Sequence, residues 1–186
     1  MRKSWPMFVT ALVVSLSACE QEPVAVVSTA SFSAAPTSGA AFAEVRSATA
    51  RYHRVDVAIA DGYLPDTPCM FSTAGARGHL YTNRPLIDGV VDASRPELLL
   101  YEPTKNGELR LVGVAFLVVA AAWDAVNSTP PTLGGQEFTD RRLPPTGAPF
   151  PNYILFAWVW RHNPDGLHAP FNPRVSCEYA VNAVQL

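Results

Sequence analysis

The side chains best suited to metal chemistry are two histidines and a glutamate at the ends of predicted strands. His79 begins a short strand, Glu102 ends the next, and His162 follows the last clear strand. If these strands adjoin, two imidazoles and a carboxylate meet at one end of the sheet, a donor set that suits zinc, iron or copper. The alternative is that each histidine hydrogen-bonds to a loop backbone. We favour no metal and predict no cofactor, because the convergence rests on an assumed strand order.

Large aromatic side chains form a second group, on the strand predicted over residues 153–160. The two-residue period places Phe156, Trp158 and Trp160 on one face of that strand and Tyr153 on the other. Three rings on one face can line an apolar pocket, and indole N–H groups supply donors within it. The same rings can instead form the core of the sheet, packed against a helix.

From these rings we predict a pocket between helix and sheet that binds a small apolar or aromatic ligand. Its walls are the three rings, and its polar contacts are His79, Glu102 and His162. The segment 161–172, which reads R-H-N-P-D-G-L-H-A-P-F-N, adds polar side chains on a stiff loop, where binding sites often form. The alternative for this segment is a turn whose asparagines and aspartate cap backbone groups.

The sequence lacks the motifs of several enzyme classes. It contains no G-x-S-x-G, no phosphate-binding glycine-lysine loop, no G-x-G-x-x-G and no H-E-x-x-H. The carboxylates are scattered, so no glycosidase pair can be named. Whether the protein is an enzyme stays open, and the absences favour a binding module.

The charge excludes one class of partner. The formal net charge of the 186 residues is −2, and no basic block occurs. Nucleic-acid binding requires a clustered cationic footprint, so nucleic acid is excluded as a partner.

Apolar residues at three- and four-residue spacing predict one long helix over residues 42–62. Gly62 is a plausible end for it. The predicted buried face carries Val45, Ala48, Tyr52, Val55, Ile59 and Tyr63.

Strands are predicted after this helix, over residues 79–83, 98–102, 109–119, 153–160 and 175–184. Asn106-Gly107 marks a hairpin between the second and third of them. A short helix is expected over residues 120–126, and loops over 64–78 and 127–151. This order indicates an α+β class, in which one long N-terminal helix packs on a curved, mainly antiparallel sheet.

The N-terminus resembles the signal of bacterial lipoproteins. Arg2 and Lys3 precede an apolar run, which ends in Leu16-Ser17-Ala18-Cys19. The resemblance implies cleavage before Cys19, lipid such as palmitate on its thiol, and a lipid-anchored extracytoplasmic protein. Glu20 fits the outer membrane, on its periplasmic side, if the host has one. The alternatives are an ordinary signal peptide with an incidental cysteine and a single membrane anchor.

Three segments follow from this interpretation of the N-terminus. Residues 1–18 form the signal peptide, residues 19–41 a flexible tether rich in small residues, and residues 42–186 a single α+β domain. The membrane, reached through the lipid on Cys19, is the expected partner. Protein partners and oligomeric state do not follow from the sequence.

The remaining cysteines, Cys69 and Cys177, are expected to form a disulfide. An exported chain reaches an oxidising compartment, and the two residues lack C-x-x-C spacing. The alternative is a pair of thiolate metal ligands.

Three stretches, G-H-L-Y-T-N, P-E-L-L-L-Y-E-P and W-V-W-R-H-N-P-D-G, resemble an uncharacterised group of exported bacterial proteins. The resemblance covers roughly residues 46–178 and implies no activity. The leading function is therefore a lipid-anchored small-ligand-binding module. The alternatives are a mononuclear metal-binding protein or metalloenzyme at His79, Glu102 and His162, and a structural envelope lipoprotein.

Overall fold

The computed structural model describes residues 38–143 and 150–186, which all belong to one compact unit. Cys19, the predicted signal peptide and the predicted tether up to residue 37 lie outside the described residues. In the described part, short helices accompany a curved and mainly antiparallel sheet. The α+β class and the character of the sheet are thus confirmed.

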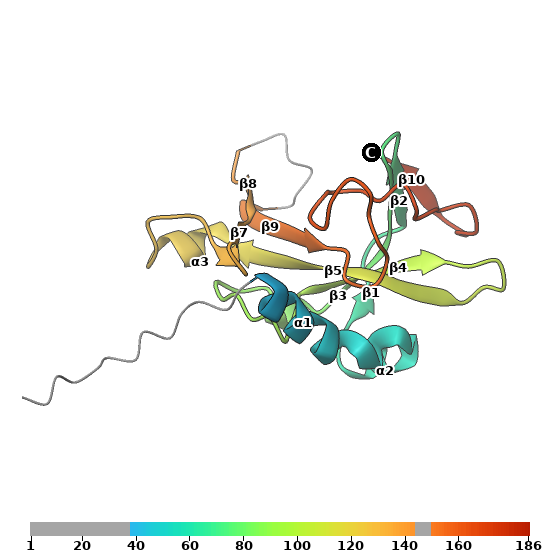
Figure 1. Ribbon diagram of the computed structural model, residues 1–186, viewed down its shortest axis with the longest axis horizontal. Helices are drawn as coiled ribbons and strands as arrows, with labels where there is room; N and C mark the ends of the chain where they lie inside the picture. Colours follow the sequence, from blue (N-terminus) through green and yellow to red (C-terminus); the bar gives the residue numbers. More distant parts are fainter. Residues whose placement is uncertain (1–37, 144–149) are drawn as a thin grey trace, which may run out of the picture. The chain divides into compact units, whose positions relative to one another are not determined.

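The main sheet has the strand order β10-β2-β3-β4-β5-β9-β8, and β1 pairs with the end of β3. Neighbouring strands run antiparallel except β10 and β2, which are parallel. In Figure 1 both edges, β8 at one end and β2 with β10 at the other, lie on the side away from α1 and α2. The strands are β1 Leu64–Pro65, β2 Cys69–Ser72, β3 Gly75–Thr82, β4 Leu98–Pro103, β5 Leu109–Val119, β8 Thr139–Arg141, β9 Asn152–Ala157 and β10 Ala183–Gln185.

The prediction of one long N-terminal helix is wrong. The helical segment begins at Ser38 and divides into α1 (Ser38–Thr49), a 3₁₀ turn η1 (Ala50–His53) and α2 (Val55–Ala60). The break falls at Arg54, whose backbone is extended (φ −93°, ψ 108°). The hydroxyl of buried Tyr101 donates a 2.6 Å hydrogen bond to the Tyr52 carbonyl, a group that an amide four residues along would bond in a continuous helix. A contact from the sheet therefore satisfies the backbone where the helix stops.

The break changes which residues face the sheet after Tyr52. Val45, Tyr52 and Tyr63 are buried as predicted, whereas Ile59 is 43% exposed and Ala58 is fully buried in its place. The three- and four-residue spacing therefore identifies the buried residues correctly only where the helix is continuous.

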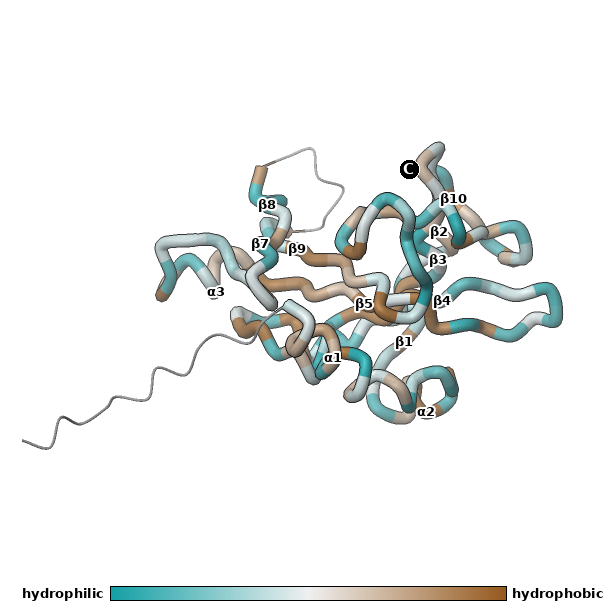
Figure 2. The backbone as a smooth tube through the Cα atoms, viewed as in Figure 1, coloured by the Kyte–Doolittle hydropathy of each residue, from teal (hydrophilic) through white to brown (hydrophobic). Residues whose placement is uncertain are grey.

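Both faces of the main sheet are apolar. On one face, residues such as Leu99, Tyr101, Val114 and Phe116 join Phe42, Val45 and Tyr52 of the helical segment in one buried cluster. On the other face, a second cluster contains Met70, Leu80, Leu98, Leu100, Ile154, Phe156, Trp158 and Val175. Figure 2 shows β5 and β9 apolar along much of their length, as expected for strands covered on both sides.

A β-bulge in β3 contributes to the curvature. Phe71 of β2 pairs with Ala76, but the preceding Met70 pairs with Gly78, so Arg77 is an extra residue on β3. Gly78 has φ +80°, and a Cβ built there would lie 2.2 Å from the Tyr101 carbonyl oxygen. Bulges bend the strand and re-aim its side chains, and this one requires glycine.

The C-terminal segment is fastened to the sheet by a disulfide, as predicted. Cys69 at the start of β2 is bonded to Cys177, with a Cα–Cα distance of 5.7 Å and a sequence separation of 108 residues. The Ser176 amide donates to Glu102 Oε1 (3.0 Å), and buried Asn172 exchanges backbone hydrogen bonds with Ala76. The segment therefore covers part of the face opposite the helices.

Several element predictions are corrected in detail. The strand over 175–184 is wrong, since only β10 forms near this end of the chain. The predicted loop 64–78 contains β1, β2 and the start of β3. The loop 127–151 contains β8 and a small pair, β6 (Thr132–Leu133) with β7 (Gln136–Glu137). Prolines and glycines in both segments interrupt the alternating pattern, so the short strands there depend on tertiary pairing.

Other elements are confirmed. The β4–β5 hairpin turns at Asn106-Gly107, and β5 has the predicted bounds. A short helix, α3 (Ala120–Asp124), follows it within the predicted range 120–126. Apart from these confirmed elements, the 3₁₀ turn η2 (Arg84–Leu86) lies in the connection between β3 and β4.

Gly78→Ala should destabilise the protein more than Gly107→Ala. Both glycines have nearly equal positive φ, but the Gly107 Cβ position is open, whereas the Gly78 Cβ would collide with backbone. The shared conformational cost is about 1–2 kcal/mol, and the collision adds on the order of 1–3 kcal/mol at Gly78. Urea unfolding of the two variants measures the difference. Equal losses would show that the close approach to Tyr101 is unimportant.

Candidate ligand-binding site

The three predicted aromatic walls do not share one face, because β9 ends at Ala157. The Val159 amide then donates to the Ala157 carbonyl (2.9 Å), and this turn breaks the two-residue period. Phe156 and Trp158 belong to the cluster opposite the helices. Trp160 packs on the helical side, where its indole N–H donates to Thr49 Oγ1 (3.1 Å) and its ring meets His53 at 4.4 Å between centroids.

The polar residues of the predicted site are also distributed. His79 pairs with Tyr101 across β3 and β4, so Glu102, the next residue along, projects to the opposite face. His79 Nδ1 lies 3.3 Å from the Thr67 carbonyl oxygen, the loop-backbone contact weighed as the alternative.

The carboxylate of Glu102 makes contacts within the protein. One oxygen accepts from the Ser176 amide, and the other lies 3.5 Å from Arg110 Nη1 without a hydrogen bond. His162 is exposed beyond the end of β9. Among the residues the structure describes, no three histidine, cysteine or acidic side chains are grouped to hold a metal ion. The metal site proposed at His79, Glu102 and His162 is therefore not assembled.

A small hollow lies between the helical segment and the chain after β9. This helix-side hollow, of about 420 Å³, is lined by Phe42, Arg46, Trp158, Trp160, His162 and Leu167. Arg46 occupies part of it, since its guanidinium stacks on Trp160 at 4.8 Å and donates to the Val159 carbonyl (2.6 Å). Three of the predicted ligand-binding residues, Trp158, Trp160 and His162, line this hollow. Phe156, His79 and Glu102 do not line it.

A larger cavity lies instead on the sheet face opposite the helices. This concave cavity has a volume of about 740 Å³ and spans the sheet from β2 to β8. Its apolar lining includes Met70, Leu80, Leu98, Leu117, Ile154 and Phe156, together with Phe171 of the C-terminal segment. Of the predicted ligand-binding residues, Phe156 alone is among the described residues that line it. Curvature of the sheet and partial cover by the C-terminal segment together create this space.

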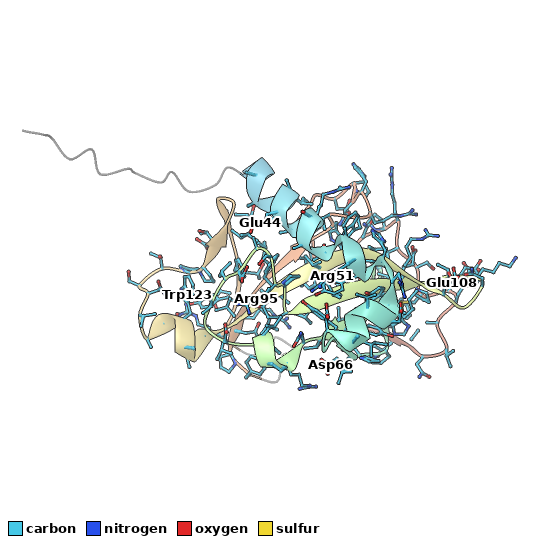
Figure 3. The ribbon with its side chains drawn as sticks, turned by 90° about the horizontal axis from the view of Figure 1, so that it is seen from below. Glu44, Arg51, Asp66, Arg95, Glu108 and Trp123 are labelled. Carbon is cyan, nitrogen blue, oxygen red and sulfur yellow. A yellow bond between two sulfur atoms is a disulfide. The ribbon has the colours of Figure 1, made fainter. Side chains whose placement is uncertain are left out.

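The charged side chains of the concave cavity are mainly cationic. Arg77, Arg84 and Arg141 line it together with one acid, Asp66. Asp66 is paired with Arg84 and also accepts a 3.0 Å hydrogen bond from the Thr82 hydroxyl. Figure 3 shows Asp66 and Glu44 of α1 on opposite sides of the molecule in that view.

Arg77 is held rigidly at the wall of the cavity. Its Nε donates to the Pro170 carbonyl (2.8 Å), and its guanidinium stacks on the rings of Phe156 (4.8 Å) and Phe171 (4.2 Å). Burial, followed by the nearby charge of Arg141, lowers the pKa of Arg77 to about 10. The side chain therefore remains cationic at neutral pH in a largely apolar setting.

Sequence reasoning missed Arg77 because it lies in the predicted loop 64–78. The only available indication was its place between Ala76 and Gly78, small residues that allow a bulge. A bulge changes the face to which a side chain belongs, and its position depends on the partner strand.

Comparison of the chain with known protein families, curated proteins and solved structures finds no match. Within residues 38–143 and 150–186, no helix has the length and apolar character needed to cross a bilayer.

A buried carboxyl group lies next to the cavity wall. Glu97 is 2% exposed, and its Oε2 accepts a 2.8 Å hydrogen bond from the Leu117 amide, just beyond the last β4–β5 pair. Burial raises the pKa of Glu97 to about 8, because a charged carboxylate is poorly solvated there. Glu97 does not line the cavity, so its role is to complete the sheet ladder.

The raised pKa of Glu97 predicts a specific pH dependence of stability. The folded state holds this proton more tightly than the unfolded state, whose pKa is near 4.5. The resulting contribution to the free energy of unfolding is therefore complete below pH 4.5 and is lost as the pH rises to about 8. Between these two values, stability should fall by on the order of 1 kcal/mol for each pH unit. Glu97→Gln should remove this decline, while exposed Glu137→Gln should not. Identical pH profiles for Glu97→Gln and wild type, from urea unfolding, would contradict the assignment.

Proposed function

We propose that this protein is a binding module that holds an apolar small molecule in the concave cavity. The supporting observation is the cavity itself, whose 740 Å³ falls within the usual range of small-molecule sites. Its lining is mostly apolar with a few polar groups, the composition typical of such sites. The proposed ligand site is therefore on the opposite side of the sheet from the pocket that the sequence predicts.

Binding is preferred to catalysis because of the side chains that line the cavity. The described lining contains no histidine, cysteine, glutamate or lysine. Its single acid, Asp66, is already paired with Arg84 and bonded by Thr82. The Thr82 hydroxyl donates to Asp66, but Arg84 engages the same carboxylate, so this acid is not free to act as a general base. A structural envelope lipoprotein is disfavoured, because a purely structural role needs no cavity of this size.

The neutral fluorescent probe phenylnaphthylamine tests the proposed function. Wild-type protein should bind it saturably, with the emission increase of an apolar site. Leu117→Trp should reduce the affinity at least tenfold, since Leu117 is partly exposed and a larger ring extends into the cavity. The matched variant Leu167→Trp alters the helix-side hollow and should leave the affinity unchanged. Absence of saturable binding to wild type, or selective loss in Leu167→Trp, would contradict the proposal.

We also propose that the module is a lipid-anchored extracytoplasmic protein, related to the exported group that its sequence resembles. The support is the Leu16-Ser17-Ala18-Cys19 motif, which lies outside the described residues. The disulfide fits an oxidising compartment. Where the host has an outer membrane, Glu20 favours that membrane.

Cys19→Ala should release the protein from the membrane fraction, because no thiol remains to carry lipid. The nearby control Gln21→Ala should stay in that fraction. Cell fractionation with immunodetection measures both. Unchanged membrane association of Cys19→Ala would contradict lipid anchoring and favour an uncleaved apolar anchor.

A further inference from the structure

Arg77 retains hydrogen-bonding capacity at the cavity wall. A guanidinium carries five N–H donors, and the hydrogen bond from Nε to Pro170 uses one of them. Among the described residues, Arg77 forms no salt bridge with a carboxylate. The guanidinium carbon lies 4.8 Å from the ring centroid of Phe156 and 4.2 Å from that of Phe171, and these contacts restrict the side chain before a ligand binds. The entropy cost of ordering Arg77 on binding is therefore small.

The charge balance of the concave cavity favours an anion. Arg77 and Arg84 line the cavity together with a single acidic side chain, Asp66, in a chain whose formal net charge is −2. Asp66 is paired with Arg84, so no acidic side chain of the described lining is left to pair with Arg77. Arg141 is close enough for its charge to lower the pKa of Arg77, and a bound anion would relieve this repulsion.

Apolar surface continues from Arg77 across the sheet. Phe156 and Ile154 lie on β9, Leu98 on β4 and Leu117 on β5, and all four line the same cavity. A ligand that fills this space therefore needs an apolar body as well as a charged end. A guanidinium binds carboxylate and phosphate through paired hydrogen bonds, which are stronger in apolar surroundings.

We propose that the ligand is an anionic amphiphile, an acyl chain whose carboxylate binds Arg77 and whose hydrocarbon lies along Leu98, Leu117 and Ile154. This inference rests on the proposed binding function and adds the chemical class of the ligand. The inference also assigns a role to the bulge, because its extra residue, Arg77, is the one that would bind the carboxylate of the ligand.

Competition against phenylnaphthylamine tests the inference with three ligands of one chain length. Dodecanoate should displace the probe from wild type at concentrations at least tenfold lower than neutral dodecanol, below the micellar range. Dodecyl phosphate distinguishes the source of the anion. Stronger displacement by the phosphate than by dodecanoate would point to a phospholipid-type headgroup and overturn the carboxylate assignment.

Arg77→Gln should abolish the preference for dodecanoate over dodecanol and change the affinity for neutral phenylnaphthylamine less than threefold. Glutamine keeps an N–H group that can bond to Pro170 and loses the charge. The control Arg95→Met, an exposed arginine paired with Asp92 and not among the cavity-lining residues, should keep the preference.

The outcomes separate the inference from the proposed function. Equal displacement of the probe from wild type by dodecanoate and dodecanol would overturn the anionic ligand and leave the binding module intact. Failure of phenylnaphthylamine itself to bind would overturn the binding module. If Arg77→Gln does not fold, as judged by near-ultraviolet circular dichroism, the wild-type comparison still decides the charge preference. Retention of that preference in folded Arg77→Gln would show that Arg77 is only a structural clamp on Pro170.

Discussion

A sheet with two apolar faces needs two covers, and this constraint organises the described part of the chain. The helical segment supplies the first cover through Phe42, Val45 and Tyr52. The second is the C-terminal segment, which is held by the Cys69–Cys177 disulfide and by the backbone pairing of Asn172 with Ala76. That second cover spans only part of its face. The curved, apolar remainder is the cavity on which the proposed function depends.

One local irregularity connects the shape of this cavity to its chemistry. Gly78 allows the close approach to the Tyr101 carbonyl, and the bulge beside it makes Arg77 the extra residue of β3. The same feature contributes to the bend of the strand and to the position of the guanidinium among the rings of Phe156 and Phe171. A cation placed among aromatic and aliphatic side chains is costly unless it serves a partner, which is why the charge and the cavity are best explained together.

The sequence predicted features that depend on local chemistry or on the compartment. These include the bounds of β5, the Asn106-Gly107 hairpin and the disulfide. It failed where distant contacts decide the outcome. The Tyr101 hydroxyl bonds the backbone at the helix break, and the turn after Ala157 sends Trp160 to the helical side of the sheet. Arg77 could not be assigned to the site, because the position of a bulge depends on the partner strand. One extra residue moves the side chains that follow it to the other face of the sheet.

Methyl-resolved NMR during titration with phenylnaphthylamine tests the location of the site most directly. The account predicts chemical-shift changes at the methyl groups of Leu80, Leu98, Leu117 and Ile154, which line the concave cavity. Val45, buried beneath the helical segment, should be unaffected. Changes confined to Leu167 and Val159, which line the helix-side hollow, would contradict the account and restore the pocket between helix and sheet.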